Sequence, residues 1–269
     1  MRTLLMLTAI LALSTPVFAA TTPWQDVAPH VRARLISADV LNPDGTTLVG
    51  LDIDMPDNFK TYWRLPGETG IPTRLDTSGS TNITSASIVW PYPTAETTNG
   101  FLDYVYRGQT VLPVLLKVGG SSAILKASVL MGVCSDICVP VKAKFTLPLS
   151  FSVPDTADDI RLGQALALAP VPGTGTAPAF GAVTFDAGSQ SLNIPLGDRN
   201  IDPASIIAST EDPTLIFDAP QKSPDNGAVI LPLRGTAKPG GWQDQPVQLT
   251  FMTPKGSFEI SERVPSATP

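Results

Sequence analysis

The sequence predicts an all-β protein with two small β-sandwich domains. Apolar residues recur mostly at every second position, which is the spacing of a strand with one buried face. Proline and glycine are abundant, at 27 and 21 of 269 residues, and the proline content is about twice the usual ~5%. Such a composition disfavours long helices and favours short strands joined by turns.

Residues 1–19 have the three parts of a secretory signal peptide. Arg2 is the positive n-region, residues 4–13 are the apolar h-region, and Val17-Phe18-Ala19 is a small-residue cleavage site. This apolar run is shorter than the ~20 residues that span a bilayer, and no later run approaches that length. We therefore expect an exported protein with no membrane span in the mature chain, in a compartment where a disulfide persists.

The first strands after the leader are predicted to form a hairpin. Apolar and polar residues alternate in residues 31–36 and again in residues 49–55. The intervening Asn-Pro-Asp-Gly sequence at 42–45 is typical of a turn. In the second run the alternation assigns Asp52 and Asp54 to a solvated face.

Four further strands are predicted within the first domain, residues 20–153. Pro113 and Pro148 fall within two of them. Because proline has no N–H to donate to a ladder, we expect these two strands at sheet edges or bulges. The four strands are expected at residues 86–90, 111–118, 124–133 and 144–151.

The second half of the chain begins with a short helix and a linker. Residues 154–178 contain an amphipathic helix pattern at 158–168 and a run rich in Pro, Gly and Thr at 169–178. Seven short strands within residues 179–269 then suggest a second small β-sandwich domain. They are expected at residues 182–185, 191–195, 205–209, 214–217, 228–233, 247–252 and 257–263, with a hairpin turn at 253–256.

The charge and the single histidine argue against several classes of function. The formal net charge is −6 and the basic residues are scattered, so we expect neither nucleic acid nor an anionic membrane surface as a partner. His30, the single histidine, precedes the first predicted strand, which argues against a Ser-His-Asp or Cys-His catalytic site. Two cysteines do not make a zinc site, which needs three or four ligands. No bound cofactor is expected.

Cys134 and Cys138 are the only cysteines, and they are four residues apart. A disulfide between them closes so short a loop that it adds only about 2 kcal/mol to stability, against about 4.7 kcal/mol for a 100-residue loop. In an extended strand their Cα atoms would be ~13 Å apart, whereas a disulfide needs roughly 4.4–6.8 Å. The chain must therefore turn back at residues 135–137 or form one helical turn. The flanking strand patterns favour the tip of a hairpin.

Three interpretations of this cysteine pair are open from the residues alone. The first is a structural disulfide, incidental to an adhesin-like sandwich. The second is a periplasmic copper site, in which Met131, Cys134 and Cys138 offer three sulfur ligands to Cu(I). The third is thiol–disulfide exchange, which is favoured because accessible disulfides are the exchangeable kind.

A series of motifs in a fixed order gives a more specific indication. The motifs are Thr61-Tyr-Trp-Arg64, Pro66-Gly-Glu-Thr-Gly70, Trp90-Pro-Tyr-Pro93, Phe101, Tyr106-Arg-Gly108, Leu112-Pro-Val114 and Cys138-Val-Pro140. Over residues 25–152 the chain thereby resembles the N-terminal periplasmic domain of the DsbD/ScsB thiol:disulfide interchange family. The resemblance is closer to the ScsB relatives.

The resemblance implies an immunoglobulin-like β-sandwich for the domain that carries the cysteines, and a redox-active disulfide in the periplasm. Members of the family take reducing equivalents from a thioredoxin-like or CcdA/DsbD-type membrane electron donor. They pass these equivalents to periplasmic disulfide-containing acceptor proteins, in processes such as cytochrome c biogenesis or copper tolerance.

The resemblance also implies roles for the two cysteines and their neighbours. Cys138, which is followed closely by Pro140, would form the mixed disulfides with partners, and Cys134 would be the resolving thiol. Asp136 lies inside the ring and is expected to form the turn.

A cap loop at residues 97–106 is implied as well, with Phe101 shielding the cysteines from oxidation. The alternative for Phe101 is a core aromatic at a strand start. Tyr62, Trp63 and Tyr106 either line the site or belong to the core.

Two departures from the family pattern stand out. The cysteines here are separated by three residues, whereas the interval is longer in the DsbD domain itself, so geometry and redox potential do not carry over. We also expect neither a transmembrane hub nor a C-terminal thioredoxin domain in this protein. As a stand-alone form it would depend on electron donors encoded separately.

Overall fold

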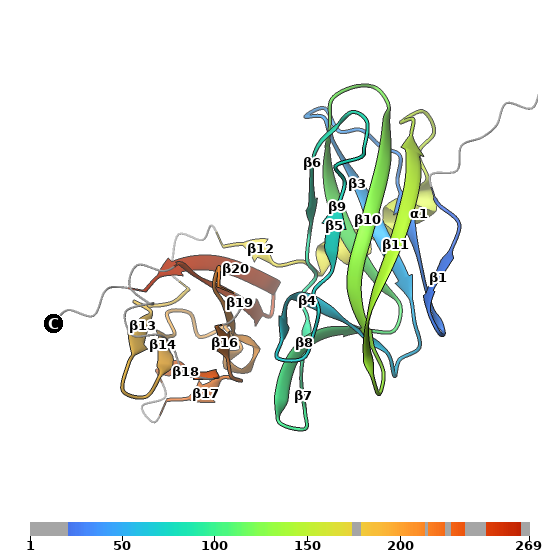
Figure 1. The fold of residues 1–269 in the computed structure, drawn as a ribbon. Helices are drawn as coiled ribbons and strands as arrows, with labels where there is room; N and C mark the ends of the chain where they lie inside the picture. Colours follow the sequence, from blue (N-terminus) through green and yellow to red (C-terminus); the bar gives the residue numbers. More distant parts are fainter. Residues whose placement is uncertain (1–20, 174–178, 213–214, 224–226, 235–245, 265–269) are drawn as a thin grey trace, which may run out of the picture.

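The structure is a computed structural model that describes residues 21–173, 179–212, 215–223, 227–234 and 246–264. The predicted signal peptide, residues 1–19, lies outside these ranges. The chain forms two β domains, each with two sheets (Figure 1), which confirms the predicted all-β fold. In the described part of the chain, no helix is long and apolar enough to cross a membrane.

The first domain is a sandwich of two antiparallel sheets with the main hydrophobic core between them. One sheet has the order β1 (Gln25–Ala28), β2 (Val31–Ser37), β3 (Thr46–Asp54), β9 (Thr110–Val118), β6 (Ile83–Ile88). The other has the order β11 (Cys138–Leu149), β10 (Ala123–Cys134), β4 (Lys60–Gly67), β8 (Phe101–Arg107), β7 (Thr94–Thr98), and β5 (Arg74–Asp76) pairs with β10.

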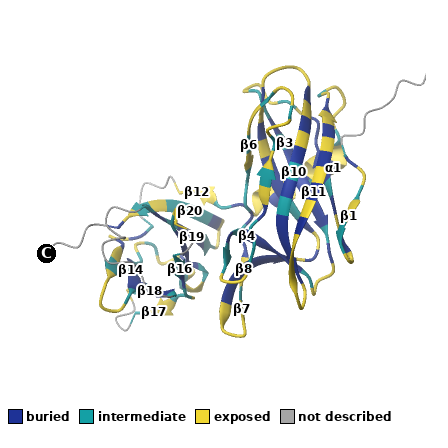
Figure 2. Ribbon diagram, viewed as in Figure 1, coloured by how far each residue is buried: buried dark blue, intermediate teal, exposed yellow. Residues whose placement is uncertain are grey.

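Buried and exposed residues alternate along these strands, as the sequence pattern predicted. Figure 2 shows the alternation most clearly on β10 and β11, where every second residue faces the core. The predicted first hairpin is confirmed, because β2 pairs with β3 and Leu35 lies opposite Leu51. The largest fully buried side chain is that of Trp63, on β4.

The single α-helix of the described residues, α1 (Thr156–Ala167), begins two residues before the predicted helix. The Asp155 side chain caps it by accepting from the backbone N–H groups of Ala157 and Asp158. Leu162 is buried against Ile36, so the helix covers the outer face of the sheet that contains β2.

This helix explains why the predicted exposure of Asp52 is wrong. The Asp52 carboxylate is fully buried, because α1 packs over the face of β3 that the strand pattern alone leaves to solvent. Arg34 and Arg161 compensate its charge, with nitrogen–oxygen distances of 2.8 and 2.7 Å. A charge this deeply buried needs such partners.

The two prolines differ in how they fit the sheets. Pro148 lies on β11, an edge strand, as predicted. The same expectation is wrong for Pro113, since β9 lies between β3 and β6. The ladder between β6 and β9 ends at the pair Ile88–Val114, immediately beside Pro113. The missing N–H of Pro113 therefore interrupts no pair of this ladder.

The second domain also has two sheets around a core of its own. The predicted strand 191–195 and the predicted turn at 253–256 are confirmed. One sheet has the order β12 (Val171–Pro172), β20 (Gly256–Arg263), β19 (Pro246–Thr253), β15 (Ile207–Ser209). The other has the order β13 (Thr184–Asp186), β14 (Ser191–Pro195), β18 (Ala228–Arg234), β16 (Ile216–Phe217), and β17 (Gln221–Lys222) pairs with β18. A 3-10 turn spans Pro203–Ser205.

The two domains contact each other through polar and apolar groups. Arg64 on β4 forms an ion pair with Glu259 on β20. The Tyr92 hydroxyl of the first domain donates to the Ser205 carbonyl of the second. Ile207 of the second domain is buried in the same cluster as the core of the first domain.

Candidate functional site

A disulfide joins Cys134 and Cys138 at the end of a long hairpin. The ladder between β10 and β11 runs without interruption from the pair Ala123–Leu149 to the pair Cys134–Cys138. The two Cα atoms are 4.1 Å apart, because the chain reverses at residues 135–137. The predicted hairpin-tip position is therefore confirmed.

The two cysteines differ sharply in exposure. Cys134 has no accessible surface, whereas Cys138 is exposed. The neighbours of Cys138 are open as well: Ile137 is 75% exposed and Val139 is 39% exposed. An incoming protein thiol can therefore approach Cys138 but not Cys134.

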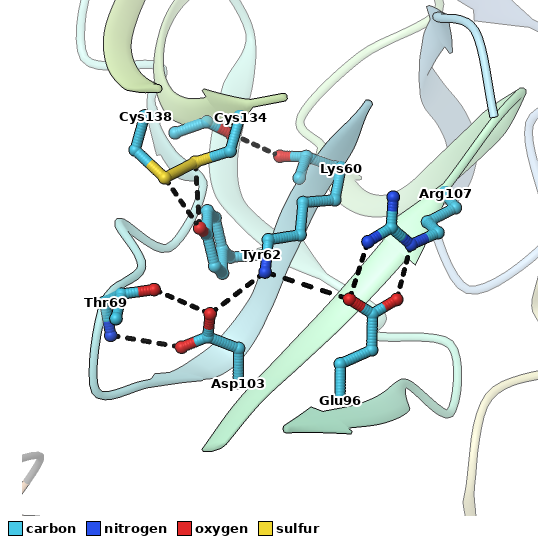
Figure 3. The surroundings of a disulfide bond; sticks show 10 residues. Lys60, Tyr62, Thr69, Glu96, Asp103, Arg107, Cys134 and Cys138 are labelled. Atoms are coloured by element: carbon cyan, nitrogen blue, oxygen red, sulfur yellow. Dashed lines mark hydrogen bonds and ion pairs between the residues drawn. A yellow bond between two sulfur atoms is a disulfide. The ribbon is translucent and has the colours of Figure 1, made fainter. Parts of the chain in front are cut away.

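Tyr62 is the side chain that lies directly on the sulfurs. Its hydroxyl is 2.8 Å from Cys134 Sγ and 3.1 Å from Cys138 Sγ (Figure 3). The ring is fully buried in a small cluster with Val105 and Cys134. Burial raises the pKa of Tyr62 above its usual value, so the phenol keeps its proton at neutral pH and can donate it to a sulfur.

A short loop that begins at the last residue of β4 packs against the Tyr62 ring. This segment, residues 67–71, is called the cover loop below. A Cβ added at Gly70 would lie 2.2 Å from a ring carbon of Tyr62, so the loop backbone at Gly70 lies in close contact with the ring. The Ile71 carbonyl accepts from the Gly132 N–H on β10 at 3.1 Å, which ties the loop to the strand that carries Cys134.

A network of charged groups lies beside the tyrosine (Figure 3). Lys60 Nζ is 3.0 Å from Asp103 Oδ2 and 3.8 Å from Glu96 Oε2. Arg107 binds the Glu96 carboxylate with two nitrogens, and this contact lowers the pKa of Glu96 below its usual value. Thr69 Oγ1 of the cover loop donates to Asp103 at 2.6 Å.

Comparison with known proteins bears directly on this site. Residues 28–150, which include both cysteines and Tyr62, match the family model described as thiol:disulfide interchange protein DsbD, N-terminal. The first domain belongs to the DsbD N-terminal domain family. This confirms the family predicted from the motifs over residues 25–152.

A solved structure resembles both domains together. The crystal structure of the N-terminal periplasmic domain of ScsB from Proteus mirabilis covers 93% of this chain and 100% of its own, with a TM-score of 0.71 and 21% identity. At this identity the likeness concerns the fold. No curated protein sequence matches the chain significantly.

The other three aromatic residues predicted for the site lie on two different faces. Trp63 and Tyr106 are in the main core, and the Tyr106 hydroxyl donates to the Pro91 carbonyl at 2.7 Å. Phe101 is half exposed at the start of β8, on the same face as Val105. It lies four residues along the strand from Val105, a distance of ~13 Å.

The hairpin tip contains the other two predicted residues. Asp136 and Pro140 are both exposed, Asp136 inside the turn and Pro140 on β11, opposite Gly132. The chain therefore presents Cys138 on a small protruding surface.

Met131 does not join the two sulfurs in this structure. It is fully buried in the main core, whereas Cys134, three residues further along β10, faces the other side of the sheet. Among the described residues, no group of three or more His, Cys, Asp or Glu side chains is arranged to hold a metal ion. The arrangement of a three-sulfur copper site is not present here.

Sequence reasoning did not single out Lys60, Thr69 or Asp103. Lys60 is two residues before Tyr62 on the same strand, so alternation alone assigns both to one face. Asp103 stands within the apolar run at 101–105, and a carboxylate in such a run needs a partner once it is buried. The partner could not be named, because Lys60 lies on another strand.

Proposed function

We propose that the protein is a periplasmic thiol–disulfide interchange protein, in which Cys134 and Cys138 relay two electrons between partner proteins. The observation that carries this proposal is the asymmetry of the pair. Cys138 is open to a partner, while Cys134 is buried under a protonated tyrosine. Membership of the DsbD N-terminal family supports it.

The oxidised pair accepts electrons in two steps. A thiolate of the donor attacks Cys138 Sγ, the intramolecular disulfide breaks, and the bonding electron pair leaves on Cys134 as a thiolate. A second donor thiolate then attacks the donor sulfur of the mixed disulfide and releases Cys138. The donor ends as a disulfide and this protein as a dithiol, with protons exchanged with solvent.

Delivery of the electrons uses the same atoms in reverse. The Cys138 thiolate attacks an acceptor disulfide and forms a mixed disulfide, which displaces one acceptor thiolate. Cys134 then attacks Cys138 Sγ, restores the disulfide and releases the second acceptor thiolate. Cys134 never has to meet the partner, which fits its burial.

Tyr62 has a defined role in this scheme. Whenever Cys134 becomes a thiolate, the Tyr62 hydroxyl at 2.8 Å can donate a hydrogen bond to it. A hydrogen bond to a charged group is stronger than one to a neutral group, so the phenol stabilises the reduced form and the leaving thiolate. Shielding by Phe101 remains a separate prediction.

The partners follow from the proposed location and chemistry. A thioredoxin-like or CcdA/DsbD-type membrane donor would supply the electrons, and exported disulfide-containing proteins would receive them. The signal-peptide pattern of residues 1–19 supports export to the compartment in which such disulfides occur.

The reduction potential of the pair tests the proposal. The purified protein is equilibrated with glutathione buffers, and its free thiols are counted after alkylation, with a double Cys→Ser variant as the blank. We expect a potential between about −270 and −120 mV, the range of exchange proteins. A value below about −300 mV, typical of inert structural disulfides, would contradict the proposal.

A further inference from the structure

The second domain reaches the cover loop of the first through one arginine. Arg234, the last residue of β18, donates to Glu68 Oε2 in the loop and, at 2.7 Å, to the Gly100 carbonyl at the tip of the β7–β8 hairpin. Asp218 of the second domain holds the other end of the guanidinium at 3.1 Å. One planar side chain thus bridges two segments of the first domain to the second.

Glu68 is also bound within the first domain. Its Oε2 accepts from the Leu102 N–H at 2.8 Å, and its own N–H donates to the Leu102 carbonyl at 3.0 Å. The contact is close, since a Cβ added at the neighbouring Gly67 would lie 2.1 Å from that carbonyl oxygen. The loop and the start of β8 therefore form one unit, which Arg234 holds from outside.

This unit continues to the disulfide. Thr69 is bound to Asp103 through its N–H and its hydroxyl, and Gly70 packs on the Tyr62 ring. The Tyr62 hydroxyl contacts both sulfurs. Each step from Arg234 to Cys134 is a direct contact between neighbouring groups.

We propose that Arg234 is a positioning residue for the cysteine pair: it fixes the cover loop, and the cover loop fixes the Tyr62 hydroxyl at the sulfurs. The second domain would then help to hold the groups around the cysteine pair in place. This inference rests on the proposed function in so far as the disulfide is redox-active.

The proposal makes a prediction about redox equilibrium. When Arg234 is replaced by a neutral residue, Glu68 loses its charged partner and the cover loop is held less firmly against Tyr62. The hydrogen bond to the Cys134 thiolate then weakens, which disfavours the reduced form. The equilibrium population of the disulfide form should therefore rise and that of the dithiol form should fall.

The test is the equilibrium constant for reduction by dithiothreitol, measured in the full chain. We expect it to fall roughly three- to tenfold in Arg234→Gln, because the hydrogen bond is weakened rather than lost, and complete loss of a hydrogen bond to a charged group corresponds to about tenfold or more. Glu68→Gln, which neutralises the other half of the pair, should cause a similar fall. Tyr62→Phe should cause a fall at least as large.

A double-variant cycle separates positioning from general destabilisation. If Arg234 acts through Tyr62, adding Arg234→Gln to Tyr62→Phe should change the constant no further. Tyr92→Phe is the matched control: it removes another hydrogen bond between the domains, to Ser205, without touching the cover loop, and should leave the constant unchanged. Hydrogen exchange of the Glu68 and Thr69 amides should accelerate in Arg234→Gln but not in Tyr92→Phe.

Two results would overturn the inference. One is an unchanged constant in Arg234→Gln and Glu68→Gln while Tyr62→Phe shifts it. The other is a full additive effect of Arg234→Gln in the Tyr62→Phe background. Both results differ from failure of the proposed function. A wild-type potential below about −300 mV would reject thiol–disulfide exchange, but the ratios of the reduction constants of the variants would still show whether Arg234 acts through Tyr62.

Discussion

At the scale of single residues, the two cysteines of the disulfide differ in how far they are buried. They face each other across the last pair of a ladder, yet one is sealed beneath Tyr62 and the other protrudes at the tip. The difference arises from the register of the hairpin, because Cys134 ends a strand that continues into the core while Cys138 begins an edge strand. The proposed exchange through Cys138 and resolution through Cys134 rest on this difference.

Residue-scale electrostatics predict how stability depends on pH. The hydrogen bond from Arg107 lowers the pKa of Glu96 below its usual value, so the folded state binds this proton less tightly than the unfolded chain does. The contribution of Glu96 is therefore present above the unfolded pKa and is lost as the pH falls through the folded pKa.

We expect Glu96→Gln to lower the free energy of unfolding at pH 7 by about 0.5–1 kcal/mol, a small value because the pair is partly exposed. The difference from the wild type should shrink as the pH falls below the ordinary glutamate pKa of about 4.3 and through the lowered pKa of Glu96 in the folded state. Urea unfolding at pH 7 and pH 3 measures it. An equal loss at both pH values would show that the charge of Glu96 is not responsible.

At the scale of elements, the cover loop depends on a glycine. A Cβ at Gly70 would stand 2.2 Å from the Tyr62 ring, and the ring is itself fully buried in a cluster with Cys134 and Val105, so it has little room to move. Gly163 in α1 offers a matched control, since a Cβ there meets nothing within 4 Å beyond the backbone of its own helix and its chain neighbours.

Gly70→Ala should lower the free energy of unfolding by about 1–3 kcal/mol through overpacking. Gly163→Ala should instead raise it by up to about 1 kcal/mol, because alanine is the better helix former. Thermal or urea unfolding of both variants distinguishes the two effects. A Gly70→Ala variant as stable as the wild type would mean that the loop does not press on Tyr62.

Local pattern also decided which elements could be predicted. The hairpin β2–β3 and the tip between β10 and β11 follow from alternation and turn residues, which are short-range signals. The burial of Asp52 could not be read this way, since the helix that covers it lies more than 100 residues later. The expectation for Pro113 was wrong for a related reason: the point where β6 ends beside it is set by tertiary structure.

At the scale of the whole molecule, the site depends on contacts between segments distant in sequence. The motifs that contain Tyr62 and Phe101 are enough to indicate the family, but they do not show which aromatic lies on the sulfurs. Nothing near Arg234 in the sequence indicates that it reaches Glu68, 166 residues away. Such a contact appears only when both domains are folded and docked.

In the proposed scheme the second domain would have a role that follows from its position. It contacts the first domain at Arg64 and Tyr92 as well as at the cover loop, so the redox domain is held at several points. The relay would then combine an exposed cysteine for partners with a buried environment that a neighbouring domain stabilises.

The most direct test of this account is to trap the mixed disulfide. Reduced Cys134→Ser and Cys138→Ser variants are incubated with periplasmic extract, and adducts that dithiothreitol releases are separated and mapped by mass spectrometry. Because Cys138 is the exposed sulfur and Cys134 is needed for resolution, Cys134→Ser should accumulate adducts through Cys138, and Cys138→Ser should give few or none. The absence of adducts with Cys134→Ser, or equal yields from both variants, would contradict the account.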